Sequence, residues 1–136
     1  MSSHLVKDLL LQKDAALFTT TPETTVQDAL ETMVTNGISS LAVLSGQELV
    51  GIISERDYIR KAVPKRIVPW EIKVRDIMTA DVISVTSENN VRECMELMSS
   101  KRIRHLPVVD GKKLIGMLSI TDIIRALRPA RIDFPG

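Results

Sequence analysis

A serine and an aspartate stand three residues apart at two places in the chain, Ser54 with Asp57 and Ser119 with Asp122. A serine at the cap of a helix and a carboxylate at its third position form a capping box, in which each side chain accepts a hydrogen bond from a free backbone N–H. The same two groups lie at the positive end of the helix dipole, a place suited to a phosphorylated ligand. Each pair therefore has two interpretations, a helix cap or part of a ligand site.

The two motifs belong to an internal repeat, which appears when the sequence is aligned with itself at an offset of 65 residues, from Gly51 to Gly116. No gap is needed, and 13 positions of residues 26–61 are identical in the second copy, far more than unrelated segments share. Two copies of one unit fill the chain. The identical pairs are Val26 and Val91, Glu31 and Glu96, Met33 and Met98, Ile38 and Ile103, Leu41 and Leu106, Val43 and Val108, Gly46 and Gly111, Leu49 and Leu114, Gly51 and Gly116, Ser54 and Ser119, Asp57 and Asp122, Ile59 and Ile124, and Arg60 and Arg125.

Each copy is predicted to begin with a strand and a helix. The strands are expected at residues 16–20 and 81–86, and the helices start after the N-caps Thr25 and Asn90. In both helices apolar residues recur at the spacing of one helix face, which predicts a buried stripe.

A hairpin and a second helix complete each copy. The hairpins turn at Gly46 and Gly111, and the second helices begin at the two serine motifs and end near Pro64 and Pro129. The predicted fold class is α/β, with two pseudo-twofold-related β-α-β-β-α repeats packed sheet to sheet and helices outside.

The first repeat with its lead-in is placed at residues 1–66 and the second at residues 67–136, together one module. The lead-ins beginning at Val6 and Val74 resemble each other at an offset of 68, so the first copy carries three extra residues near Gln12. Trp70, in the connector between the repeats, is expected to pack this loop.

Composition excludes several function classes. The net charge is +1, and a dedicated binder of nucleic acid or membrane surfaces usually carries a large basic excess. Aromatic residues make up 3% of the chain, too few for a surface that stacks bases. The charged start of the chain lacks the long apolar stretch of a signal peptide or membrane helix.

Cys94 is the single cysteine, so no internal disulfide is expected. It lies in a predicted helix stripe and is interpreted as a core residue, and the chain is assigned to the reduced cytoplasm. No P-loop, dinucleotide-binding, zinc-protease or serine-hydrolase motif is present, so we expect a protein that is not an enzyme and has no catalytic or metal site.

The doubled unit, with the stretches "DIMT", "IRHLPVVDG" and "GMLSITDII", resembles a tandem cystathionine β-synthase (CBS) domain pair of the small stand-alone type. The resemblance covers nearly the whole chain. It implies a regulatory Bateman module with two clefts that bind adenosine ligands. AMP is the favoured ligand, and ADP, ATP, NAD(H) and S-adenosylmethionine are the alternatives.

The resemblance also implies that each cleft takes its Ser-x-x-Asp motif from one repeat and its base-facing residues from the other. The site residues then divide into two sets, with His105 and Pro107 added from the strand after Arg104. The first set is Ser54, Arg56, Asp57, Thr79, Ile83, Ile103 and Arg104, and the second is Ser119, Thr121, Asp122, Phe18, Ile38 and Ser39.

The two clefts are expected to be unequal, since Arg104 and His105 replace the serines Ser39 and Ser40 of the first copy. Basic side chains facing the groove would hold phosphate, so the cleft of Asp57 and Thr79 is predicted to be the tighter one. The main rival interpretation is a constitutive interaction scaffold in which the motifs only cap helices. By resemblance the module forms a homodimer through its second helices and regulates a partner that the sequence leaves unknown.

Overall fold

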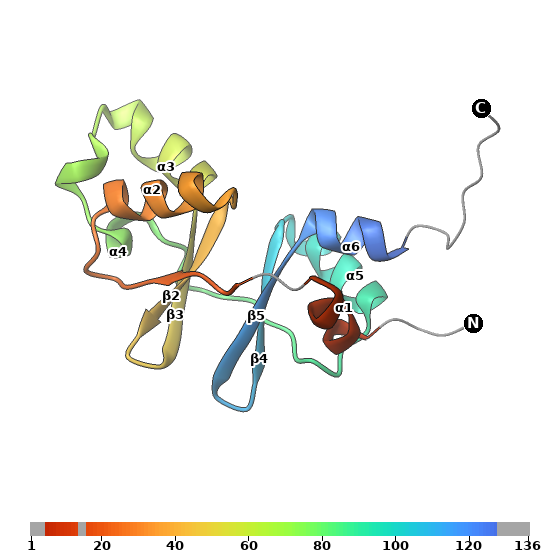
Figure 1. Cartoon of the computed structure of the whole chain (residues 1–136). Coiled ribbons are helices and arrows are strands. Elements are labelled where there is room, and N and C mark those ends of the chain that lie inside the picture. The colour runs from red at the N-terminus through yellow and green to blue at the C-terminus, as the bar shows by residue number, and fades with distance from the viewer. Residues whose placement is uncertain (1–4, 14–15, 128–136) are drawn as a thin grey trace.

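The computed structural model describes residues 5–13 and 16–127 of the 136-residue chain (Figure 1). The elements of the first repeat are β1 (Thr19–Thr20), α2 (Val26–Asn36), β2 (Ser40–Ser45), β3 (Glu48–Ser54) and α3 (Glu55–Lys61). Those of the second are α5 (Val91–Lys101), β4 (His105–Asp110), β5 (Lys113–Ser119) and α6 (Ile120–Leu127). The lead-ins form α1 (Val6–Lys13) and α4 (Val74–Ile77), and the connector forms the short 3₁₀ helices η1 (Val63–Lys65) and η2 (Pro69–Glu71).

The predicted mixed α/β fold with two repeats is confirmed. Strands β2 and β3 pair antiparallel, as do β4 and β5. The turns place Gly46 at a φ of 64° and Gly111 at 62°, in the left-handed region that glycine adopts at low cost. The two hairpins stand side by side with the helices α2, α3, α5 and α6 above them (Figure 1), and β3 contacts β5.

The predicted helix caps are also confirmed. Thr25 Oγ1 accepts a hydrogen bond of 3.1 Å from the N–H of Asp28, and Asn90 Oδ1 accepts one of 2.8 Å from the N–H of Glu93. Helix α2 ends at Gly37, which has a φ of 64°. Short-range chemistry therefore fixes where the first helix of each repeat begins.

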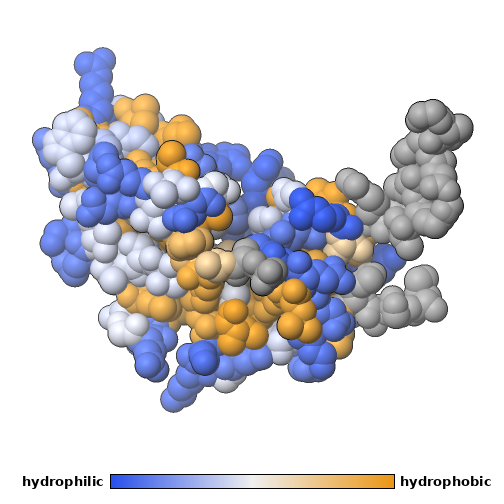
Figure 2. Space-filling model, in the orientation of Figure 1, coloured by the Kyte–Doolittle hydropathy of each residue, from blue (hydrophilic) through white to orange (hydrophobic). Residues whose placement is uncertain are grey.

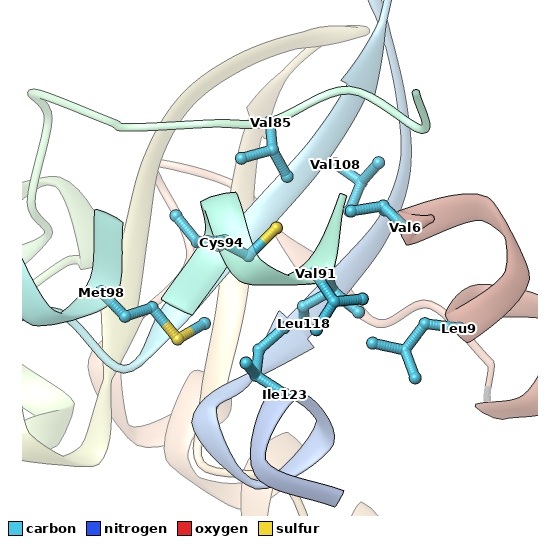
Figure 3. Close-up of a cluster of buried hydrophobic side chains, with 10 residues drawn as sticks. Val6, Leu9, Val85, Val91, Cys94, Met98, Val108, Leu118 and Ile123 are labelled. Carbon is cyan, nitrogen blue, oxygen red and sulfur yellow. The ribbon is translucent and has the colours of Figure 1, made fainter. Parts of the chain in front are cut away.

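Each repeat has its own hydrophobic core beneath the predicted helix stripe. Met33 and Ile53 are fully buried in the first core, and Val91, Cys94 and Met98 are buried in the second (Figure 3). Burying side chains of this size contributes about 1.5–3 kcal/mol each. Both cores sit between helices and hairpin and so hold the serine motifs at the ends of β3 and β5.

The two lead-ins cross over and pack on the core of the opposite repeat. Helix α1 contributes Val6 to the second core (Figure 3), and α4 contributes Val74 to the first. Backbone bonds fix both segments: Val6 N–H donates to Asn89 C=O at 2.9 Å, and Val74 N–H donates to Thr24 C=O at 2.8 Å. The crossing ties the two repeats together and brings the end of α1 to strand β5.

The prediction of full first strands was wrong in extent. Residues 16–20 form only the two-residue strand β1, and residues 81–86 form a single parallel bridge between Val85 and Val108. Val85 N–H donates to Pro107 C=O at 3.0 Å, and Val109 N–H donates to Val85 C=O at 2.8 Å. The next bond of a parallel ladder needs an N–H at residue 107, and proline has none, so the ladder stops there.

Two further expectations differ from the structure. Trp70 does not pack the connector, because its side chain is 63% exposed on η2. Ile123 lies on the second of the two helices through which the homodimer was expected to form, but it is fully buried in the second core and cannot be a dimer contact. Pro129, the expected end of that helix, lies outside the described residues.

Candidate functional site

A cleft of about 630 Å³ lies between the two repeats. It brings together seven of the predicted site residues, three from the first repeat and four from the second. They are Phe18, Ile38 and Ser39 from the first repeat, and His105, Ser119, Thr121 and Asp122 from the second. The cleft therefore has the cross-repeat composition that the resemblance implies, centred on the aspartate of the second repeat.

Asp122 is held where strand β5 passes into helix α6. Its Oδ2 atom accepts a hydrogen bond of 2.9 Å from the N–H of Ser119, and its own N–H donates to Ser119 Oγ at 3.2 Å. The capping-box interpretation of the motif is thus confirmed as geometry. Asp122 is only 8% exposed, so the box fixes a largely buried carboxylate at the edge of the cleft.

Lys13, the last residue of α1, also binds this carboxylate. Its Nζ lies 2.9 Å from Asp122 Oδ2 and donates to the C=O of Met117 at 2.7 Å. Lys13 and Met117 both line the cleft. A charged residue of the crossing lead-in therefore meets the motif of the second repeat inside the site.

The pKa of Asp122 lies below its ordinary value. Burial raises this pKa, but the N–H of Ser119 and the ammonium of Lys13 lower it by more. Hydrogen bonds and an opposite charge favour the ionised form. Asp122 is consequently a carboxylate at neutral pH and accepts, rather than donates, hydrogen bonds.

His105 joins the two repeats across the same cleft. Its Nε2 lies 3.0 Å from Ser39 Oγ, within hydrogen-bonding distance. Burial lowers the pKa of His105, and the charges of Lys13 and Arg104 lower it further against the opposing influence of Asp122 and Asp57. The neutral imidazole is therefore favoured at neutral pH.

The remaining walls of the cleft are largely apolar. Leu17 and Ile115 line it and are 40% and 36% exposed. On the face shown in Figure 2, hydrophobic surface gathers over the region of the two hairpins. Apolar walls with a few fixed polar groups suit a flat aromatic ring joined to a polar group.

The motif of the first repeat has a similar internal geometry. Asp57 Oδ2 accepts hydrogen bonds from the N–H and the hydroxyl of Ser54 at 2.8 and 3.1 Å. Lys61, four residues further on α3, lies 3.3 Å from Asp57 Oδ1 and donates to Ile77 C=O at 2.8 Å. None of these residues lines the 630 Å³ cleft.

The other residues predicted for the cleft of Asp57 lie along the second lead-in and at the start of strand β4, except Arg56, which lies on α3. Thr79 pairs with Ile52 of β3 through two backbone bonds of 2.8 and 2.9 Å. Ile83 and Ile103 pack against the second core. Pro107 is buried in β4. Arg104, which directly precedes β4, and Arg56 are exposed.

Sequence reasoning missed two charged residues of the cleft, Lys13 and Glu55. Lys13 lies beside the three extra residues near Gln12, so the length difference between the lead-ins was the available signal. Glu55 is the first residue of α3 and lines the cleft from the first repeat. Its place after Ser54 gave no indication of which repeat it would face.

A comparison with family models matches the CBS domain model twice, over residues 6–63 and 74–129. These two matches cover most of the chain. The chain belongs to the CBS domain family. It is a CBS pair, the type of protein that is commonly regulatory and not catalytic.

Known proteins agree with this assignment. The chain is 39% identical over 134 residues to the CBS domain-containing protein CBSX3, mitochondrial, of Arabidopsis thaliana, covering 92% of this chain and 65% of that relative's length. A putative signal-transduction protein with CBS domains from Burkholderia ambifaria superimposes with a TM-score of 0.89 at 36% identity, covering 96% and 99% of the two chains. A hexameric CBS-CP12 protein from bloom-forming cyanobacteria superimposes with a TM-score of 0.83 at 25% identity, covering 96% of this chain and 78% of that protein's chain.

Within residues 5–13 and 16–127, no helix is both long and apolar enough to cross a membrane. Over the same residues, no group of three or more histidine, cysteine or acidic side chains is arranged to hold a metal ion.

Proposed function

We propose that this CBS pair is a regulatory sensor that binds an adenosine ligand between its repeats and thereby modulates a partner protein. The observation that carries the proposal is the cleft of about 630 Å³ that unites Asp122 of one repeat with Phe18 and Ile38 of the other. A ligand bound there contacts both repeats at once. Its binding energy is then available to change how the repeats sit relative to each other.

The chemistry of the cleft supports a ribose-containing ligand. A carboxylate accepts hydrogen bonds from both hydroxyls of a ribose, and the bonds from Ser119 and Lys13 both reach Oδ2 of Asp122, leaving Oδ1 as an acceptor. A phosphate is favoured at the start of α6, where Ser119 and Thr121 carry hydroxyls. Phe18 and Ile38 offer an apolar surface for the base.

AMP is the ligand we propose first, because one phosphate can be accommodated at one helix start. ADP, ATP, NAD(H) and S-adenosylmethionine share the adenosine group and are the alternatives. The cleft of Asp57 and Thr79 remains a second proposed site, and it contains the same Ser-x-x-Asp geometry. Its greater affinity was expected because of Arg104 and His105. His105 lines the cleft of Asp122 instead, so Arg104 is the basic residue that still supports this proposal.

A second function, a constitutive interaction scaffold, is favoured by one specific observation. Both motifs are already satisfied internally, because each aspartate accepts from its serine N–H and pairs with a lysine. Ser-x-x-Asp is then explained by helix capping alone. Such a scaffold binds no adenosine ligand.

Thermal unfolding with AMP, ADP, ATP, NADH and S-adenosylmethionine separates the two functions. A ligand present at 100 times its dissociation constant adds about 2.7 kcal/mol to the free energy of unfolding, which raises the melting temperature measurably. A shift with at least one of these ligands supports the sensor. Unchanged melting with all five, at millimolar concentrations, favours the scaffold.

The proposed assembly is a homodimer formed through α3 and α6. Ile59 and Ile124 occupy matching positions in the two repeats and are 60% and 50% exposed. Exposed apolar side chains at equivalent places suit a symmetric contact. Light scattering at micromolar concentration tests this, with a dimer expected for the wild type and a mass of 15.1 kDa if the proposal is wrong.

The proposal also includes a regulated partner protein and a cytoplasmic location. The thiol of Cys94 is free and buried, which is compatible with a reducing compartment.

A further inference from the structure

The two motif aspartates are paired with lysines from different parts of the chain. Lys61 lies on the same helix as Asp57, four residues away, and its second partner is the C=O of Ile77. Lys13 comes from the lead-in of the other repeat, and it is a lining residue of the cleft that contains Asp122. Only one of these two lysines can therefore meet a ligand in that cleft.

The charges that line this cleft are unbalanced. Among its lining residues the carboxylates are Glu55 and Asp122, and the ammonium group is that of Lys13. His105 also lines it, and burial holds its pKa below the ordinary value, so it adds little positive charge at neutral pH. The attraction of the cleft lining for an anion thus depends on Lys13.

Lys13 has the geometry to use that charge. An ammonium group has three N–H donors, and the bonds of Lys13 to Asp122 and Met117 use two of them. The side chain is 30% exposed. One donor is left for a ligand next to the carboxylate proposed to hold the ribose.

The last turn of α1 packs against strand β5. Leu10 Cδ2 lies 2.6 Å from the point where a Cβ atom on Gly116 would stand, so a larger residue at this position would displace the Leu10 side chain. Leu10, Gly116 and Lys13 all line the cleft. The close packing of Leu10 presents Lys13 to the cleft in a defined position, which reduces the entropy cost of using it.

We propose that Lys13 determines the charge selectivity of the Asp122 cleft, so that it favours an anionic nucleotide over the neutral nucleoside. This inference rests on the proposed adenosine-binding function and names the residue that discriminates among such ligands. Without the ammonium group, a phosphate faces two carboxylates and, among the described residues of the lining, no opposing cation. Neutral adenosine meets no such repulsion, and a cationic ligand would bind with higher affinity than before.

The test is isothermal titration of AMP and adenosine into Lys13→Gln, Lys13→Arg and the matched control Lys7→Gln. Lys7 lies on the same helix but pairs with Glu88 on the surface, outside the cleft. All variants are also made with Asp57→Asn, to weaken the other proposed site. Melting curves establish that each variant is folded.

Lys13→Gln is expected to lower the ratio of AMP affinity to adenosine affinity by about tenfold, the effect of losing one charge-assisted hydrogen bond. Lys13→Arg and Lys7→Gln are expected to keep the wild-type ratio. An unchanged ratio in Lys13→Gln overturns the inference while the proposed function stands. Binding by the wild type that vanishes with Asp57→Asn locates the ligand at the other motif and also overturns it. A wild type that binds neither AMP nor adenosine overturns the inference, and the proposed function falls with it only if ADP, ATP, NADH and S-adenosylmethionine also leave the melting temperature unchanged.

Discussion

Ser39 Oγ and His105 Nε2 lie 3.0 Å apart and link the two repeats across the cleft. Ser39 precedes strand β2, and His105 begins strand β4. Burial lowers the pKa of this imidazole most. The charges of Lys13 and Arg104 lower it further, and those of Asp122 and Asp57 raise it. A proton on this ring therefore acts on the contact between the repeats as well as on the cleft.

The first prediction concerns this histidine and pH. The pKa of His105 in the folded protein lies below 6.5, so below about pH 6.5 the unfolded chain binds more protons than the folded one. The contribution of His105 to the free energy of unfolding is therefore fully present above about pH 6.5 and is lost as the pH falls toward the pKa of His105 in the folded protein. Melting temperatures at pH 7.5 and 5.5 should differ more for the wild type than for His105→Gln. Equal differences in the two proteins would contradict the role of His105.

The second prediction concerns Cys94. Burial, together with the charge of Glu93, raises the pKa of its thiol to about 11, and the side chain is fully buried in the second core. The thiolate is the reactive form, so a thiol reagent at pH 8 should modify the native protein far more slowly than the protein in denaturant. Rapid modification under native conditions would show that the second core opens readily.

The third prediction compares two glycines at equivalent positions of the repeats. A Cβ atom on Gly51 would meet Met78 Sδ at 2.6 Å and the backbone oxygen of Thr79 at 3.0 Å, whereas the three atoms nearest to one on Gly116 all belong to the side chain of Leu10. A backbone oxygen yields less than a flexible side chain. Gly51→Ala is thus expected to lower the free energy of unfolding by about 1–3 kcal/mol, the usual cost of overpacking, and Gly116→Ala by less. Chemical denaturation measures both, and the reverse order would contradict this account.

The fold could be predicted from the sequence because its signals are local and occur twice. The caps Thr25 and Asn90 and the turns at Gly46 and Gly111 act within a few residues, and the offset of 65 residues shows each of them again. The short second ladder could also have been predicted, since Pro107 stands where the first repeat has Ala42 and lacks an N–H.

The composition of the cleft was harder to predict because it depends on the crossing of the lead-ins. Local patterns give no sign that α1 packs on the opposite repeat, so Lys13 could not be placed beside Asp122. Arg104 and His105 were expected to face the groove together. Successive residues of an extended chain point to opposite sides, and in the structure His105 lines the cleft while Arg104 does not.

The fourth prediction separates the two interpretations of Ser-x-x-Asp. Asp122 fixes the start of α6 through Ser119, and as a cap alone its replacement in Asp122→Asn should cost at most about 1 kcal/mol of stability and leave ligand affinity unchanged. If Asp122 holds the ribose hydroxyls, Asp122→Asn should weaken AMP binding in this cleft by about 1.5–3 kcal/mol, the range for hydrogen bonds to charged groups. Asp57→Asn should have the same effect at the other cleft only.

A second ligand distinguishes this role from that of Lys13, whose ion pair with Asp122 is also lost in Asp122→Asn. A change in charge alters the preference for AMP over adenosine, whereas loss of the ribose contact alters the preference for AMP over 2′-deoxy-AMP. Isothermal titration of the wild type, Asp57→Asn and Asp122→Asn with these three ligands resolves both effects. A wild type that binds AMP, with an unchanged ribose preference in both variants, would leave the aspartates as helix caps, because exchanging a carboxylate that contacts the 2′-hydroxyl for a neutral amide weakens that hydrogen bond and so reduces the advantage of ribose.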